Sequence, residues 1–229
     1  ITDWNTKIDF TYLPNLRNNI KFGTQYTYHT FIPASVSGQS GEVSFIPETI
    51  FKQYANEGSL YFSDDYELTD RIKINMGGRY TVFQHDGYIS IKDMINNEFT
   101  QETESQYRHF EPRFSARYSI NSTTSFKSSF TQNYQYIHLA SLGGMSMPMD
   151  LWLPSSSIIK PTKGEQYTTG IFKNFKNNSI ETSIELYYKE MENLIEYKEG
   201  SFPEDNANAS QDELLTFGDG QSYGAEFFV

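Results

Sequence analysis

The chain of 229 residues contains no cysteine, and this absence removes two kinds of site at once. A disulfide framework and a thiolate metal centre both require cysteine. The chain also lacks any run of roughly 18 apolar residues, so we expect no helix that spans a bilayer. It does not open with a charged stretch followed by an apolar one, so no signal peptide is visible. The chain begins inside what looks like a strand at residues 4–12, so we expect that further sequence precedes residue 1.

Positive charge is also scarce. There are 18 Lys and Arg residues against 29 Asp and Glu residues, which gives a net charge of -11. A surface that binds nucleic acid needs clustered positive charge, so we exclude nucleic acid as a partner. The HExxH motif, the CxxC motif and a phosphate-binding glycine loop are all missing, and the four histidines fall on separate segments. We therefore predict that the protein is not an enzyme and uses no cofactor.

Aromatic residues are abundant, with 17 Tyr and 18 Phe, and apolar side chains alternate with polar ones along several segments. In the segment 109–120, Phe110, Phe114 and Tyr118 fall on one side of an extended chain, and charged residues fall on the other. Successive side chains of a strand point to opposite faces, so this pattern indicates strands with one apolar face. We predict about nine strands on this criterion. They cover residues 4–12, 20–28, 59–68, 72–83, 109–120, 124–138, 165–176, 180–188 and 223–229.

The connections between these strands alternate in length. Short connections lie at residues 14–18, 69–71, 121–123 and 177–178, and long ones lie at about 31–58, 86–107, 139–164 and 200–218. Tight turns at one end and long loops at the other are typical of outer-membrane β-barrels, with the tight turns facing the periplasm. A soluble antiparallel sandwich would also alternate. However, the long loops all fall at one end, and charge is clustered on the polar faces. We therefore predict an all-β, antiparallel transmembrane β-barrel.

Four stretches carry a resemblance to a known family. Residues 61–80 (YFSDDYELTDRIKINMGGRY) resemble a hairpin of TonB-dependent receptors. Residues 111–120 (EPRFSARYSI), 159–170 (IKPTKGEQYTTG) and 220–226 (GQSYGAE) resemble the same family in the same order. Residues 150–156 (DLWLPSS) are similar to receptors of Bacteroidetes-type bacteria, which include SusC-like transporters.

The resemblance implies a barrel of about 22 strands that is closed around an N-terminal plug domain. Residues 1–229 would then be a partial barrel domain, without the plug and the remaining strands. The implied function is TonB-driven import of a scarce extracellular ligand across the outer membrane. A siderophore or metal chelate, a glycan and a peptide all remain open as the ligand. The alternative is a structural or assembly barrel that keeps the receptor fold inside a larger envelope complex.

The resemblance also implies partners. Outer-membrane lipid and lipopolysaccharide would surround the barrel, and TonB would contact the N-terminal region that this chain does not contain. A glycan or peptide importer would add a SusD-like surface lipoprotein as a lid over the loops.

Basic residues recur on the polar faces of the predicted strands. We expect these side chains to face the barrel interior, where they could pair with acids of the plug or guide an anionic solute. An ordinary polar lumen wall would look the same. The candidates are Lys73, Arg79, Arg113, Arg117 and Lys127.

The apolar faces are expected to contact lipid, with aromatic side chains forming girdles at the membrane interfaces. Tyr134 and Tyr136 fall on the face that we assign to lipid, so we predict that they are girdle residues. His109 and Glu111 share a polar face and could form a metal or acid–base pair. We expect them instead to be two hydrated residues of the barrel interior.

The long loop at 139–164 has the best claim to contact a ligand or partner. Its candidate residues are Met145, Met147, Met149, Asp150 and Trp152. Alternate methionines offer soft ligands to copper(I), although such loops more often pack against themselves or a partner. The acidic segment 180–217 could bind Ca²⁺ or bridge to lipopolysaccharide through cations, but a solvated acidic loop is the simpler interpretation.

Overall fold

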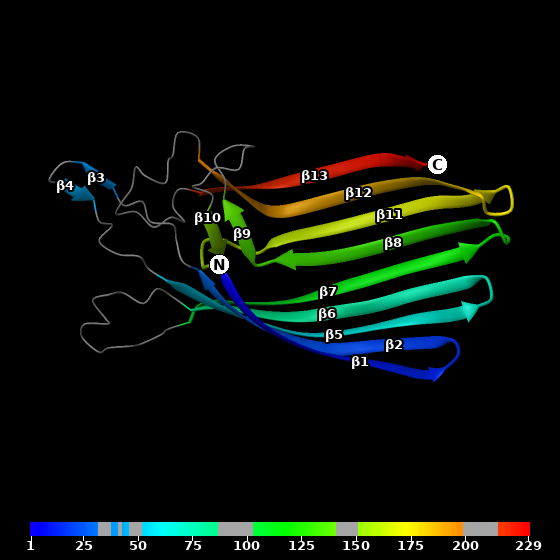
Figure 1. Cartoon of the computed structure of the whole chain (residues 1–229), viewed down its shortest axis with the longest axis horizontal. Coiled ribbons are helices and arrows are strands. Elements are labelled where there is room, and N and C mark those ends of the chain that lie inside the picture. The colour runs from blue at the N-terminus through cyan, green and yellow to red at the C-terminus, as the bar shows by residue number, and fades with distance from the viewer. Residues whose placement is uncertain (32–37, 41–42, 46–51, 87–102, 141–150, 199–214) are drawn as a thin grey trace.

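The computed structural model describes residues 1–31, 38–40, 43–45, 52–86, 103–140, 151–198 and 215–229. Its main element is a sheet of nine antiparallel strands in the order β1-β2-β5-β6-β7-β8-β11-β12-β13 (Figure 1). Their bounds are Thr2–Asn15, Asn18–Phe31, Gln53–Thr69, Ile72–Asp86, Thr103–Ser119, Thr124–Gln135, Thr162–Phe175, Ile180–Tyr197 and Leu215–Phe228. In this part of the chain no helix is long and apolar enough to cross a membrane.

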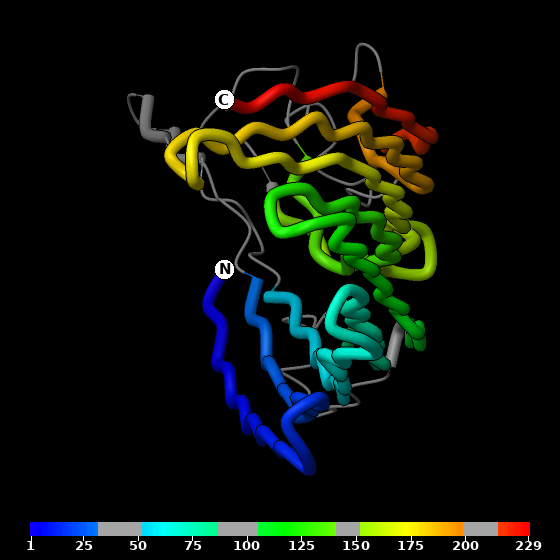
Figure 2. Tube along the Cα trace, turned by 90° about the vertical axis from the view of Figure 1, so that its right-hand side faces the viewer, coloured from blue at the N-terminus to red at the C-terminus, as the bar shows by residue number. Residues whose placement is uncertain are grey.

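The sheet is curved into an open trough. Figure 2, seen along the strands, shows the chain bending from β1 to β13, with both termini on the open side. Tight turns join the strands at one end. At the other end lie two small sheets, β3–β4 (Gly38–Ser40 and Val43–Phe45) and β9–β10 (Ile137–Ala140 and Leu151–Pro154). This arrangement confirms the predicted meander of all-β hairpins.

Each of the nine predicted strands is present, but several are longer than predicted. β5 begins at Gln53 rather than at residue 59, and β7 begins at Thr103 rather than at residue 109. The extra residues lie at the end of the sheet that carries the long connections. There the outer face is no longer consistently apolar, so the alternation that marks the rest of each strand fades before the strand ends.

The predicted single strand at 124–138 is wrong in its last part. β8 ends at Gln135, and the following residues form β9, which pairs with β10. β8 also loses its pairing with β7 beyond Thr131 and Arg113, although it stays paired with β11 up to Gln135. The upper part of β8 is therefore held on one side only, and the chain can turn there into a separate hairpin.

The convex face of the sheet is apolar and exposed. Register places Phe114 opposite Phe130, and Phe130 opposite Tyr167, so the apolar positions of neighbouring strands form continuous rows. Phe110, for example, is 58% exposed. A soluble sandwich would bury such a face against a second sheet. An apolar face left bare over nine strands is instead what a lipid-facing barrel wall presents.

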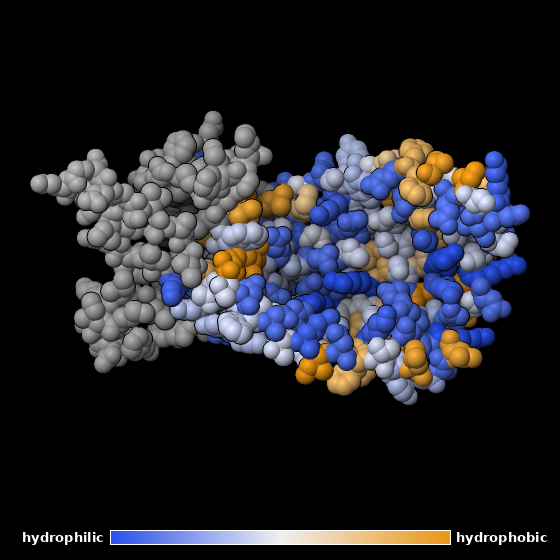
Figure 3. Space-filling model, in the orientation of Figure 1, coloured by the Kyte–Doolittle hydropathy of each residue, from blue (hydrophilic) through white to orange (hydrophobic). Residues whose placement is uncertain are grey.

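The concave face is polar. Figure 3 looks into the trough, where hydrophilic residues dominate the middle and apolar residues gather at the upper and lower margins. Several glycines on this face are covered by a side chain of the adjacent strand. A Cβ added at Gly23 would collide with the Tyr61 hydroxyl and the Ile8 carbonyl, and one added at Gly224 would meet Tyr187. Glycine is needed there because a large neighbour folds over the backbone.

The tight turns are stabilised locally. In the β1–β2 turn, the Asn15 side-chain oxygen accepts hydrogen bonds from the backbone amides of Arg17 and Asn18, at 2.8 and 3.0 Å. In the β11–β12 turn, Asn177 and Asn178 have φ values of 56° and 67°, in the left-handed region that asparagine tolerates. The polar composition of the short connections therefore has a direct structural reason.

Candidate functional surfaces of the barrel wall

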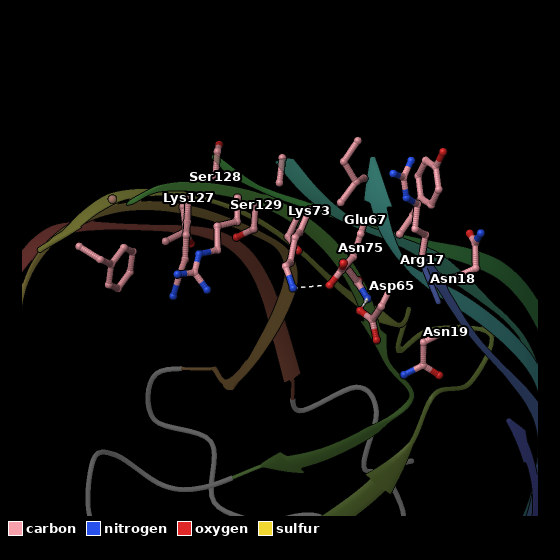
Figure 4. A pocket seen from close by; sticks show the side chains of 18 of the residues that line it. Arg17, Asn18, Asn19, Asp65, Glu67, Lys73, Asn75, Lys127, Ser128 and Ser129 are labelled. Atoms are coloured by element: carbon pink, nitrogen blue, oxygen red, sulfur yellow. Dashed lines mark hydrogen bonds and ion pairs between the residues drawn. The ribbon is translucent and has the colours of Figure 1, made fainter. Parts of the chain in front are cut away.

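The structure places all five predicted interior cations on the concave face. They occupy the same alternate positions of the strands as Ser115 and Thr131. These positions are one residue away from the apolar positions, so their side chains point to the opposite face. Figure 4 shows Lys73, Lys127 and Ser129 extending toward the concave side, whereas Ser128 points away from it. The five residues are Lys73, Arg79, Arg113, Arg117 and Lys127.

Some of these cations pair with acids of the same wall. The Arg79 guanidinium lies 3.4 Å from the Glu57 carboxylate and 3.4 Å from the Gln25 side-chain oxygen. Lys73 forms an ion pair with Glu67. The Lys73 and Glu67 side chains are both about half exposed, so the pair contributes at most about 1 kcal/mol to stability. Such pairs hold side-chain positions more than they stabilise the fold.

The other three interior cations lack a carboxylate partner within the described residues. Arg113 donates a hydrogen bond to the side-chain oxygen of Asn133, at 3.3 Å. The Lys127 ammonium lies 3.8 Å from the centre of the Phe172 ring, in a cation–π contact. No hydrogen bond or ion pair is described for Arg117.

An aromatic cluster lies on the concave face at the end that carries the long connections. Phe83 and Tyr136 stack with their ring centres 4.9 Å apart, and His109 stacks on Tyr134 at 3.8 Å. The Tyr136 hydroxyl is 3.1 Å from His109 Nδ1, and Tyr136 is only 4% exposed. We refer to Phe83, His109, Tyr134 and Tyr136 as the rim cluster.

The rim cluster corrects the prediction that Tyr134 and Tyr136 are girdle residues on the lipid side. The prediction continued the alternation of β8 through residue 138. In the structure, β8 separates from β7 above Thr131, and both tyrosine rings contact residues of the concave face. Counting alternate residues does not predict the face of a side chain beyond the point where the strand separates from its neighbour.

Glu111 also departs from its prediction as a hydrated interior residue. It is 5% exposed, and the Thr81 hydroxyl donates a hydrogen bond of 2.9 Å to its carboxylate. His109, two residues away, contacts the aromatic rings of the rim cluster instead. Within the described residues, no group of three potential ligands is arranged to hold a metal ion.

The β9–β10 hairpin carries Trp152, which is the one described residue among the five candidates of the predicted ligand loop. Trp152 lies directly opposite Leu139 and is 46% exposed, and Leu139 is exposed beside it. Met145, Met147, Met149 and Asp150 lie outside the described residues, in the connection that joins these two strands. Trp152 and Leu139 thus form an exposed apolar pair at the base of that connection.

The segment that follows β10 is held firmly against the sheet. The Tyr107 hydroxyl donates a hydrogen bond of 2.5 Å to the Ser156 carbonyl, and the Ser155 amide donates one of 2.7 Å to the Tyr136 carbonyl. Beneath the hairpin lies a small buried core that reaches β12 and β13. It consists of Ala140, Leu153, Ile159, Tyr197 and Leu215. The hairpin therefore has a fixed position between β7 and the ends of β12 and β13.

His138 is buried inside this hairpin. Its Nε2 lies 2.9 Å from the Ser155 hydroxyl, and its Nδ1 lies 3.4 Å from the Thr162 hydroxyl. Burial disfavours the charged imidazolium and lowers the pKa of His138 to about 4. The neutral ring is therefore the form that fits this site. Sequence reasoning missed this role, because nothing near His138 in the sequence marks Ser155 as its partner.

Part of the acidic segment lies on the convex face. Glu165 pairs in register with Glu190, and Lys163 forms ion pairs with Glu165 at 2.8 Å and with Glu192 at 3.1 Å. The acids between residues 199 and 214 lie outside the described residues. Binding of Ca²⁺ or lipopolysaccharide by this segment therefore stays a prediction.

Solved structures with a similar fold include outer-membrane receptors and a transporter. The chain matches the pyoverdine outer membrane receptor FpvA of Pseudomonas aeruginosa PAO1 with a TM-score of 0.59 and 15% identity, over 98% of this chain and 32% of that one. It matches the ferric-catecholate import receptor Fiu of E. coli K12 with a TM-score of 0.56 and 13% identity, over 98% and 34%. It matches the FrpB iron transporter of Neisseria meningitidis with a TM-score of 0.60 and 11% identity, over 98% and 33%.

These likenesses establish the fold, and the chain spans about a third of the length of each of these structures. A comparison with curated protein sequences finds no match. The model of the family described as "TonB dependent receptor-like, beta-barrel" matches residues 2–229. Because this match covers nearly the whole chain, the chain belongs to the TonB-dependent receptor-like β-barrel family.

Proposed function

We propose that this chain forms part of the wall of an outer-membrane, TonB-dependent transporter that imports a scarce extracellular ligand. The observation that carries the proposal is a nine-stranded wall with a bare apolar convex face and a charged concave face, in a chain of this receptor family. Lipid would contact the convex face, and the concave face would line the plugged interior. TonB would act on the N-terminal plug region expected for a transporter of this kind.

The similar structures favour one ligand class as the first to test. They include receptors whose names specify pyoverdine and ferric catecholate. We propose a siderophore-type metal chelate as the ligand. Glycans and peptides are the next ligand classes to test. An importer of either class would have a SusD-like lipoprotein as a further partner, as expected for a Bacteroidetes transporter of the SusC type.

Ligand capture is proposed at the end of the wall that carries the long connections. Trp152 and Leu139 leave apolar surface exposed there, on a hairpin whose position is fixed by its buried core. An aromatic side chain held in place offers a large contact area at a low entropic cost. The neighbouring residues 141–150, with their three methionines, would contribute to the same surface.

The test is uptake of radiolabelled ferric chelates by cells that carry the full-length protein. We expect Trp152→Ala to reduce ligand binding and uptake about tenfold, as for a central aromatic contact, while the barrel keeps its heat-modifiable migration. Ile184→Ala is the matched control, because Ile184 is an exposed apolar residue of the convex face. It should leave uptake unchanged.

Two results would contradict this proposal. Uptake that is independent of TonB would remove the active-transport mechanism. Unchanged uptake in the Trp152 variant, together with the loss of a co-purifying envelope protein, would favour the structural or assembly barrel instead.

A further inference from the structure

The ladder between β7 and β8 stops partway along the wall. Its last pair is Arg113 with Thr131, although β7 continues beside β6 and β8 continues beside β11. The next pair in the same register would join Pro112 to Gln132. We refer to the stretch beyond Arg113 and Thr131, where β7 and β8 are no longer paired, as the seam.

The backbone of Pro112 points toward β8. In antiparallel strands the N–H and C=O of one residue point to the same neighbouring strand, and successive residues alternate. The Ser119 amide donates to the Arg71 carbonyl on the β6 side, and the Ile120 amide donates to the Thr124 carbonyl on the β8 side. The even-numbered residues of β7 therefore point toward β8. Proline has no N–H, so the donor is missing at the position where the ladder stops.

A side chain bridges the two strands at the start of the seam. The Gln132 side-chain amide donates a hydrogen bond of 3.3 Å to the Phe110 carbonyl. The Phe110 carbonyl therefore also points toward β8, in agreement with the alternation. Farther along, β8 ends at Gln135, and β9 runs out of line with it (Figure 1).

The seam begins where the apolar band of the membrane ends. Pro112 lies roughly nine residues from the middle of the tight turn between β7 and β8, which is about 23 Å along the membrane normal for a strand tilted by about 40°. The apolar band is about 25 Å tall. Within lipid an unpaired backbone group is costly, whereas beyond the band water can hydrate it. The two strands thus stay paired through the lipid and separate where water begins.

The sequence of β8 is compatible with a longer ladder. Tyr134 and Tyr136 alternate with polar residues, as in a strand that reaches the membrane interface. In the structure, however, Tyr136 stacks on Phe83, and the Ser155 amide donates to the Tyr136 carbonyl. These contacts tie the β9–β10 hairpin to the concave side. The segment therefore has two possible arrangements, and the donor missing at position 112 disfavours the longer ladder.

We propose that Pro112 is a positioning residue for ligand capture. It ends the ladder at the outer edge of the membrane, so that β8 leaves the wall and the β9–β10 hairpin folds toward the barrel mouth with Trp152 exposed. A residue with a backbone N–H at position 112 extends the ladder and draws the hairpin into line with the wall. The pairing argument needs no ligand, and only the effect on capture rests on the proposed function.

The first test is hydrogen exchange, read residue by residue by mass spectrometry, in the full-length protein in lipid vesicles. In the wild type, the amides of Arg108 and Phe110 point into the seam and should exchange rapidly. Pro112→Thr supplies the missing donor and a β-branched side chain. It should slow the exchange of these two amides at least about tenfold, because a free strand edge becomes paired.

The second measurement is uptake of the radiolabelled ferric chelate by cells. Pro112→Thr should raise the KM about tenfold and change the maximal rate less than about twofold, because the hairpin is displaced while the rest of the wall is intact. A general defect in assembly would lower the maximal rate instead.

Gln132→Pro is the compensating substitution. Gln132, like Thr124, points its backbone toward β7, so proline there blocks the extended ladder and leaves the pairing of β8 with β11 intact. Pro112→Thr combined with Gln132→Pro should restore rapid exchange and the wild-type KM. Ser115→Thr is the matched control, because it adds the same side chain to a paired part of β7, and it should change neither measurement.

Unchanged exchange of Arg108 and Phe110 in the Pro112→Thr variant overturns the proposal, and so does slowed exchange with an unchanged KM. Slow exchange that persists in the double variant shows that the missing donor is not the cause of the seam. A wild-type protein that takes up no ferric chelate would contradict the proposed function, and the exchange measurement would still decide the role of Pro112 in pairing.

Discussion

Replacing Ala116 with arginine tests the orientation of the wall most directly. β7 ends at Ser119, just before the tight turn to β8. Ala116 lies about five residues from the middle of that turn, which is about 13 Å along the membrane normal for a strand tilted by about 40°. The apolar band of an outer-membrane barrel is about 25 Å tall, so Ala116 lies near its middle. Its neighbours on the convex face are Ile74 and Ser128.

An arginine at this depth faces lipid and cannot easily reach water. We expect Ala116→Arg to reduce the free energy of unfolding by about 2–4 kcal/mol. Arg117→Ser, one residue along the strand, removes an exposed side chain of the concave face and should cost less than about 0.5 kcal/mol. The measurement is denaturant unfolding of the full-length protein in lipid vesicles, with heat-modifiable migration as a check on assembly.

Spin labels at positions 116 and 117 give a second readout. A lipid-soluble quencher should reach the label at 116 and leave the label at 117 largely unaffected. A larger stability loss for Arg117→Ser than for Ala116→Arg, or quenching at 117 alone, would refute the assignment of the faces. A shift of one residue in register reverses every side chain of the strand, so the two results must agree.

Three further predictions follow from particular residues. Gly23→Ala should destabilise the full-length protein by about 1–3 kcal/mol in the same unfolding assay, because its Cβ collides with covering atoms, whereas Gly58→Ala, which meets nothing within 4 Å, should not. The pKa of His138 in the folded hairpin lies below that of an unfolded histidine. The unfolded hairpin therefore binds more protons than the folded one at acidic pH. The stability that is present at neutral pH is lost as the pH falls from about 6.5 toward 4. The loss should be about 2–3 kcal/mol at pH 4.5, seen as faster proteolysis of the hairpin, and a His138→Gln variant that kept this pH dependence would contradict it. On intact cells, an impermeant maleimide should label Ile158→Cys, which lies on the surface beside the hairpin, and should not label Ser122→Cys in a tight turn; the opposite pattern would invert the topology.

The nine long strands were predictable because each carries its own signal. A strand that faces lipid on one side and water on the other must alternate, and this requirement acts on every residue pair from Phe110 to Tyr118. The same argument predicted that Arg117 and Lys127 share the polar face of the sheet, since both occupy polar positions of strongly patterned segments. The tight turns were predictable from their Asn, Asp, Ser and Thr residues.

The rim cluster and the β9–β10 hairpin could not be predicted from the alternation of single strands. The position of Tyr136 in the sequence continues the alternation of β8, which predicts the convex face, yet its ring lies against Phe83 on the concave face. The loss of pairing between β7 and β8 above Thr131 decides this outcome, and pairing is a property of two strands rather than of one. The burial of Glu111 was missed for the same reason, because its hydrogen-bond partner Thr81 belongs to a different strand.

The sequence by itself determined the class of fold, the number of long strands and the face of the side chains where a strand is paired on both sides. Local alternation is sufficient for this, because the pleat couples each residue to its immediate neighbours. Only the tertiary structure decided which side chains meet across strands, including the pairing of Lys73, Arg117 and Lys127 into one row. Register between strands depends on turn geometry and on the packing of the whole sheet, and no single segment of the sequence records it.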